Sequence, residues 1–116
     1  MTLQRYLPIE ELTVTPIDNI PEEFREDVRM VVRILQSYRV RRVILYGSVA
    51  RGDFRKDSDL DFCIEGLDVR YFFVALAECL LSVARPLSII DLDSLSGYFL
   101  DRVLSEGTIV YEQKYT

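Results

Sequence analysis

Two aspartates stand at alternate positions, Asp59 and Asp61, and a third, Asp91, lies inside the apolar run SIIDL. Strand side chains alternate between faces, so Asp59 and Asp61 would share one face, roughly 6.5–7 Å apart along the backbone. If the strand carrying Asp91 pairs beside theirs, three carboxylates meet. At ~4 Å and an effective dielectric of about 20, each like-charge pair costs on the order of 4 kcal/mol. Mg²⁺ offsets such repulsion and binds a few carboxylates together with water and phosphate oxygens.

A Gly-Ser pair, Gly47 and Ser48, lies upstream of these carboxylates and is followed by the basic residues Arg51, Arg55 and Lys56. Glycine lets the backbone approach a ligand closely or adopt a positive φ. The Ser48 hydroxyl and the N–H groups of the turn could face an anion. The segment is not a P-loop, because the Lys-Ser/Thr pair of that motif is missing. The stretch therefore predicts a site that holds a cation against a phosphate.

Each of these residues also has an ordinary structural interpretation. Asp59 and Asp61 could be polar residues of an edge strand, and Asp91 could cap a helix or sit in a turn. The Gly-Ser pair could simply end a strand, and the basic residues could form a solvated face. Asp93, two positions on, shares the strand face of Asp91 and competes with it for the third position. Taken together, three carboxylates downstream of a Gly-Ser turn favour the metal site.

Alternating helical and strand patterns predict the elements that position these residues. Apolar spacing predicts helices over residues 21–38 and 68–84 and from Ser94 or Ser96 to about residue 106, and apolar or β-branched runs predict strands over residues 40–46, 59–65, 87–92 and 108–111. We therefore expect an α+β fold: a small mixed sheet of about four strands with helices packed on one face and the three aspartates on the other. Residues 1–20 read as an N-terminal arm and residues 21–116 as one domain.

The aspartate face should carry apolar groups beside the site, because Leu87 and Ile89 share the parity of Asp91, and Cys63 that of Asp61. An exposed apolar patch of this kind often marks an interface, so this face could form the contact of an oligomer. Alternatively, apolar side chains of the N-terminal arm fold over this patch; they are Leu3, Tyr6, Leu7 and Ile9.

The amino-acid composition excludes several kinds of catalytic and binding site. The chain has 116 residues, a net charge of −5, two cysteines and no histidine. Without histidine, His-based zinc sites, Ser-His-Asp triads and a His general base are excluded. The acidic balance argues against general nucleic-acid binding, though not against a triphosphate in a local basic pocket. Cys63 and Cys79 read as buried free thiols. No apolar run could span a membrane and no signal peptide is evident, so we expect a cytoplasmic protein.

The stretch GSVARGDFRKDSDLD, residues 47–61, resembles the signature of the DNA polymerase β-like nucleotidyltransferases: Gly-Ser, ten residues, then Asp-x-Asp. The preceding strand VILY and the later IIDL support this resemblance, and the short length and the ending EGTIVYE resemble the minimal nucleotidyltransferase (MNT) subgroup. The resemblance covers about residues 21–112. It implies the nucleotidyltransferase fold and a metal-dependent transfer of a nucleotide from a nucleoside triphosphate.

The resemblance also implies residue roles. Asp59, Asp61 and Asp91 would be catalytic and bind metal, with two Mg²⁺ ions about 3.5–4 Å apart that stabilise the attacking and leaving oxygens. Asp91 would also help to deprotonate the attacking hydroxyl. The nucleotide-binding residues would be Gly47, Ser48, Arg51 and Ser58, with ATP as the substrate.

MNT proteins are typically paired with small helical HEPN-domain proteins in toxin–antitoxin systems. The resemblance therefore implies an antitoxin that transfers AMP from ATP to a tyrosine of a HEPN ribonuclease toxin. Two alternatives stay open. The chain could neutralise its partner by complex formation alone, or it could be an enzyme that modifies a small molecule or an RNA end.

Overall fold

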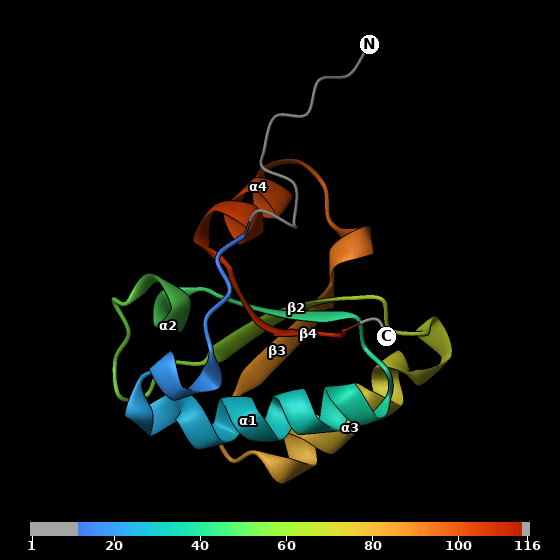
Figure 1. Cartoon of the computed structure of the whole chain (residues 1–116), viewed down its shortest axis with the longest axis horizontal. Coiled ribbons are helices and arrows are strands. Elements are labelled where there is room, and N and C mark those ends of the chain that lie inside the picture. Colours follow the sequence, from blue (N-terminus) through green and yellow to red (C-terminus); the bar gives the residue numbers. More distant parts are fainter. Residues whose placement is uncertain (1–11, 115–116) are drawn as a thin grey trace.

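The computed structural model describes residues 12–114, in which helices alternate with the strands of one sheet (Figure 1). The elements are α1 (Glu22–Ser37), β1 (Arg42–Tyr46), α2 (Ser48–Arg51), β2 (Leu60–Glu65), α3 (Phe72–Ser82), β3 (Leu87–Asp91), α4 (Gly97–Glu106) and β4 (Thr108–Glu112). Short 3₁₀ turns precede or follow them: η2 (Ile17–Asn19), η3 (Val69–Tyr71) and η4 (Leu92–Ser94). Each predicted helix and strand is present, with boundaries that differ by a few residues.

The sheet has the strand order β3-β2-β1-β4. Strand β1 runs antiparallel to both β2 and β4, whereas β2 and β3 are parallel. A parallel pair needs a crossover connection, and α3 provides it. The mixed four-stranded sheet and the α+β class are thus confirmed.

Helices α1 and α3 pack on one face of the sheet (Figure 1). Phe24, Val28, Val31 and Leu35 of α1 are fully buried, which follows from their spacing on one helical face. Residues Leu87 and Ile89 of β3 belong to this side. The prediction that they lie on the carboxylate face is wrong, because the alternation along β3 turns them toward α1 and α3.

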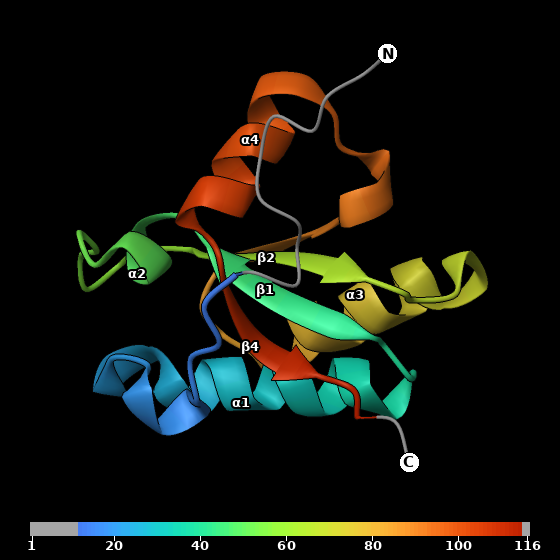
Figure 2. The ribbon, with the colours of Figure 1, turned by 45° about the horizontal axis from the view of Figure 1, so that its top comes forward.

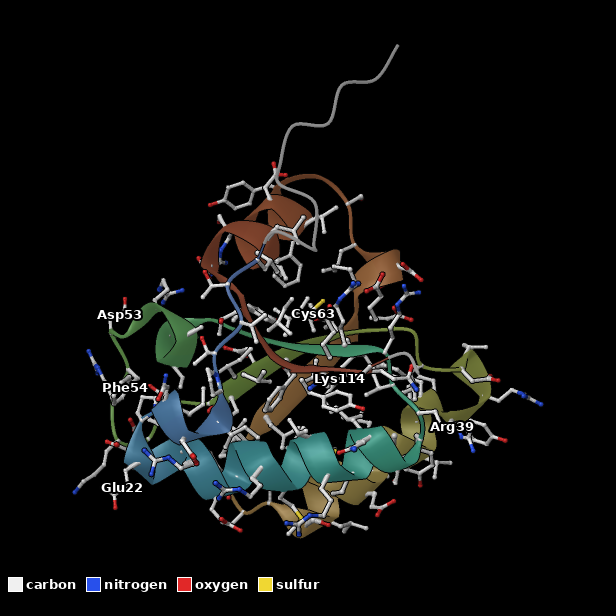
Figure 3. The ribbon with its side chains drawn as sticks, viewed as in Figure 1. Glu22, Arg39, Asp53, Phe54, Cys63 and Lys114 are labelled. Carbon is white, nitrogen blue, oxygen red and sulfur yellow. The ribbon has the colours of Figure 1, made fainter. Side chains whose placement is uncertain are left out.

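Helix α4 covers the opposite face of the sheet, which the sequence did not predict (Figure 2). Its buried residues Val103 and Leu104 pack with Ile44 and Cys63 of the sheet and with Leu12. The Cys63 side chain lies between the sheet and α4 (Figure 3). Burial raises the pKa of the Cys63 thiol to about 12. Both Cys63 and Cys79 are buried free cysteines, as predicted.

The segment before α1 runs beside the edge strand β4. Thr15 N–H donates to the Ile109 carbonyl over 2.9 Å, and Ile109 N–H donates to the Thr13 carbonyl over 2.8 Å. This part of the predicted N-terminal arm therefore extends the sheet edge. Leu3, Tyr6, Leu7 and Ile9 lie outside the described residues. Among residues 12–114, no helix has the length and apolar content needed to cross a bilayer.

Candidate active site

The turn at Gly47 connects β1 to the single helical turn α2. Gly47 has a backbone φ of +81°, a conformation that residues other than glycine rarely adopt. A Cβ atom placed on Gly47 would lie 2.3 Å from Oδ2 of Asp61, well inside van der Waals contact. Only glycine thus lets the Asp61 carboxylate pack directly against the backbone of the turn. The positive φ expected at Gly47 is confirmed, and the close approach that the structure shows is to Asp61.

Asp59 and Asp61 flank the start of β2. Asp59 is exposed just before the strand, and Asp61 is partly buried within it. Burial raises the pKa of the Asp61 carboxyl above its ordinary value, and the nearby charge of Asp59 raises it further. The two carboxylates therefore lie close enough for their charges to interact. A cation bound between them would relieve their repulsion.

Two neighbouring strands frame Asp61 in the sheet. Tyr46, the last residue of β1, is its partner on one side, and Ser88 of β3 is its partner on the other. Ser88 Oγ donates a hydrogen bond to Oδ1 of Asp61 over 3.0 Å. Burial, followed by the charge of Asp61, raises the pKa of the Tyr46 hydroxyl. The sequence prediction missed both residues. A polar residue, Ser88, within the apolar run of β3 was the signal that could have pointed to a site position on this strand.

Asp91 does not join the carboxylate pair. Although β3 lies beside β2 as predicted, the register pairs Asp91 with Ile64, three residues beyond Asp61. Three residues of strand span roughly 10 Å. Asp91 instead caps η4, where its Oδ1 accepts a hydrogen bond from the Asp93 backbone N–H over 3.0 Å. Within residues 12–114 no group of three metal-ligating side chains is placed to share an ion, so the expected meeting of three carboxylates does not occur.

The connector between α2 and β2 folds back on the Gly47 turn. Ser48 Oγ and Ser58 Oγ are 3.2 Å apart, and Ser58 Oγ accepts a hydrogen bond from the Arg55 backbone N–H over 2.7 Å. Phe54 packs edge-to-face against Phe24 of α1, with ring centroids 5.1 Å apart. Two predicted nucleotide-binding residues, Ser48 and Ser58, are therefore in contact in space, although they are ten residues apart in the chain.

Two arginines share one carboxylate beside the pair. Glu106 of α4 accepts from Arg51 Nη1 over 3.0 Å and from Arg102 Nε over 3.2 Å. Arg51 also contacts Asp53 over 3.3 Å. The positive charges of Arg51 and Arg102 both act to lower the pKa of Asp61, although burial outweighs them. The sequence prediction missed Arg102, because its i,i+4 spacing from Glu106 indicates only an ordinary ion pair on a helix surface.

Comparison with known proteins identifies the family of the chain. A family model described as "Polymerase beta, Nucleotidyltransferase" matches residues 30–116, most of the chain. The chain belongs to this nucleotidyltransferase family. "Putative protein adenylyltransferase MJ0604" of Methanocaldococcus jannaschii is 32% identical over 80 residues, which are 63% of this chain and 80% of that protein.

Solved structures share the nucleotidyltransferase fold at low sequence identity. A chain of a toxin–antitoxin complex with AMP-PNP superimposes with a TM-score of 0.60 and 17% identity, over 81% of this chain and 76% of that chain. A chain from the complex of tri-AMPylated Shewanella oneidensis HEPN toxin with MNT antitoxin gives a TM-score of 0.59 and 15% identity, over 77% and 72% of the two chains. At these identities the likeness establishes the fold.

The oxygen donors near the Gly47 turn are those of a small magnesium site. Asp59 and Asp61 are adjacent carboxylates, and the Ser48 hydroxyl lies near the same turn. Mg²⁺ is commonly held by one or two carboxylates plus water and substrate phosphate oxygens, so the pair suits one such ion. The donors do not suit a site built on three carboxylates, because Ser88 stands where β3 faces Asp61.

Proposed function

We propose that this nucleotidyltransferase transfers AMP from ATP to a protein acceptor, a tyrosine of a HEPN ribonuclease toxin, and so acts as a cytoplasmic antitoxin. The observation that carries the proposal is the Asp61 carboxylate, packed against the Gly47 turn and close to Asp59, in a member of this family. The M. jannaschii relative, named as a protein adenylyltransferase, supports AMP transfer to a protein. The fold shared with an MNT antitoxin complexed with an AMPylated HEPN toxin supports the partner.

The reaction forms a bond between the tyrosine oxygen and the α-phosphorus of ATP. It breaks the bond between that phosphorus and the bridging oxygen, and it releases pyrophosphate and a proton. Mg²⁺, when bound, supplies positive charge that stabilises the charge developing on the phosphate oxygens. Asp59 and Asp61 would hold the ion. The Gly47 backbone and the Ser48 and Ser58 hydroxyls would hold the triphosphate.

Arg51 and Arg102 complete the proposed triphosphate site. Guanidinium groups pair with phosphate oxygens through two parallel hydrogen bonds, which fixes orientation as well as charge. Glu106 now engages both arginines and keeps them beside Asp61. Phosphate would compete with Glu106 for these donors. We assign Arg51 and Arg102 to the β- and γ-phosphates.

The carboxylate pair supports one Mg²⁺ more directly than the two ions that the family resemblance implies. A second ion would lack the third protein carboxylate and would depend on water and phosphate oxygens. Asp91 is therefore left out of our proposed metal site, and its catalytic role is the part of the sequence prediction that the register argues against.

The experiment is transfer of labelled AMP from ATP to a purified HEPN-domain protein from the same genome, in Mg²⁺ and in EDTA. We expect Mg²⁺-dependent labelling of the partner that is lost in Asp59→Asn and Asp61→Asn. Asp57→Asn is the matched control, because Asp57 is an exposed aspartate of the same connector. Unchanged labelling in both site variants would show that the pair is not the active site.

A non-catalytic antitoxin is the second candidate, and the missing third carboxylate favours it. In that case the chain would neutralise the toxin by covering it. Toxin activity measured with the Asp59→Asn/Asp61→Asn double variant separates the two functions. Retained neutralisation supports complex formation alone, whereas lost neutralisation with retained binding supports AMP transfer. Labelling assays with small-molecule and RNA acceptors address the remaining alternative.

A further inference from the structure

Helix α3 is apolar on two opposite sides. Its inner side buries Ala75 and Cys79 against the core. On its outer side Phe73 is 75% exposed and Leu81 is 89% exposed. Of the nine large hydrophobic side chains that are exposed in residues 12–114, six lie in η3 and α3: Val69, Tyr71, Phe73, Val74, Leu80 and Leu81. Such a concentration on one helix is typical of an interface.

The outer stripe of α3 carries no charge. The one charged residue of α3, Glu78, turns toward α1, where its carboxylate accepts a hydrogen bond from the Tyr38 hydroxyl over 2.8 Å. Just before the helix, Arg70 pairs with Asp68 over 2.7 Å. A partner for the stripe therefore needs apolar surface and no complementary charge.

The stripe is symmetric about Ala77. Phe73 and Leu81 lie four residues before and after it, and Val74 and Leu80 lie three residues before and after it. At 100° per residue these five positions cover about 120° of the helix, centred on Ala77. Ala77 is exposed and has the smallest side chain of the five. This pattern has the self-complementarity that a two-fold symmetric contact requires.

We propose that a second copy of this chain covers the stripe, with the two α3 helices antiparallel and Ala77 at the two-fold axis. Phe73 of each copy then packs against Leu80 of the other, and Val74 against Leu81. The small Ala77 side chains permit the close approach of helices packed 8–10 Å apart. We estimate on the order of 500 Å² of apolar surface on each copy, so the pair buries about 1,000 Å², the minimum for a biological interface and the size of a weak one.

The proposed dimer leaves both active sites accessible. Helix α3 lies with α1 on one face of the sheet, whereas Asp61 belongs to the face that α4 covers (Figure 1). Pairing through α3 therefore blocks neither the Gly47 turn nor the carboxylate pair. The inference does not depend on the proposed function, because it concerns a surface on the other side of the molecule.

Sedimentation velocity on the full chain, from micromolar to submillimolar concentration, tests the dimer. We expect association to twice the chain mass of 13.5 kDa. Ala77→Arg should be monomeric throughout with an unchanged circular dichroism spectrum, since the position is exposed. Tyr98→Arg, on the exposed side of α4, is the matched control and should still dimerise. A single-chain mass at every concentration, or a dimer that persists in Ala77→Arg, would overturn the proposal.

A cysteine at position 77 gives an independent readout. Side chains at a two-fold axis between close helices come within disulfide range. Ala77→Cys should therefore oxidise to a covalent dimer much faster than Tyr98→Cys. The native Cys63 and Cys79 do not compete, because both are buried. Equal rates of oxidation in the two variants would contradict the antiparallel arrangement, as would a monomeric Ala77→Cys product.

Discussion

Ser88 Oγ donates a hydrogen bond to Oδ1 of Asp61 over 3.0 Å, and the two residues are direct partners across the parallel strands β3 and β2. The hydroxyl thus occupies the position from which a third carboxylate would face Asp61. A donor at this position stabilises the ionised carboxylate, whereas a carboxylate would repel it. The site is accordingly built around two carboxylates and one orienting hydroxyl.

Replacing Ser88 should harm catalysis more than replacing Asp91. Loss of an outer hydrogen-bond partner of a metal ligand typically costs about 10–100-fold, so we expect Ser88→Ala to lower kcat/KM for AMP transfer by that range. Asp91→Asn keeps the cap on η4 and should leave kcat/KM within about threefold. Steady-state kinetics of both variants measure the difference. A loss in Asp91→Asn as large as that in Asp61→Asn would place Asp91 back in the site.

Gly47 should tolerate alanine less well than Gly52. Both glycines have positive φ, +81° and +93°, so alanine costs each of them roughly 1–2 kcal/mol of backbone strain. Only at Gly47 does the added Cβ collide with Asp61; around Gly52 nothing lies within 4 Å of it. Urea unfolding should show the larger loss of stability for Gly47→Ala, accompanied by loss of AMP transfer. Equal losses in the two variants would mean that the carboxylate does not press on the turn.

The ionised Asp61 carboxylate should lower the free energy of unfolding of the metal-free protein at neutral pH. Because burial and Asp59 raise its pKa in the folded state, the folded protein binds this proton more tightly than the unfolded chain does. The ionised carboxylate therefore lowers the free energy of unfolding above the raised pKa. This cost disappears as the pH falls below the unfolded value of about 3.9.

Thermal unfolding in EDTA measures this cost through Asp61→Asn. The variant should have a higher Tm than the wild type at pH 7, and the difference should shrink as the pH approaches about 4. Asparagine can still accept the Ser88 hydrogen bond. Asp57→Asn serves as the exposed control. A lower Tm for Asp61→Asn at pH 7 would contradict the direction of the pKa shift.

Arg51 and Arg102 should contribute to triphosphate binding. Removing a charge-assisted hydrogen bond costs about 1.5–3 kcal/mol, so each alanine variant should weaken ATP binding at least about tenfold. AMP should lose less affinity, because it lacks the β- and γ-phosphates. Arg29→Ala is a matched control, since Arg29 pairs with Glu26 on α1, away from the site. Equal losses for ATP and AMP would remove the two arginines from the triphosphate site.

The sequence predicted the parts of the fold that local patterns encode. Phe24, Val28, Val31 and Leu35 defined α1 by their spacing, and the alternate apolar residues Leu60, Phe62 and Ile64, all buried, defined β2. Gly47 was singled out for a positive φ or a close approach to a ligand; the positive φ is confirmed, whereas its contact with Asp61 was not predicted. These features depend on residues that are close in the chain.

The relative register of β2 and β3 is what the sequence did not reveal. A parallel pair joined through α3 has no turn that fixes its offset, so the sequence prediction placed Asp91 opposite Asp61, whereas the register places Ser88 there. Placement of α4 likewise depends on non-local packing of Val103 and Leu104 against Ile44. Arg102 became visible as a site residue only after α4 was placed on the carboxylate face.

The central claim is that the Asp59–Asp61 pair and the Gly47 turn hold a nucleoside triphosphate together with a divalent cation. Isothermal titration of the full chain with a non-hydrolysable ATP analogue, in Mg²⁺ and in EDTA, tests it most directly. We predict one binding event that requires Mg²⁺, is lost in Asp61→Asn and is retained in Asp57→Asn. Binding that is equally tight in EDTA and in Asp61→Asn, or no binding under any condition, would contradict the claim.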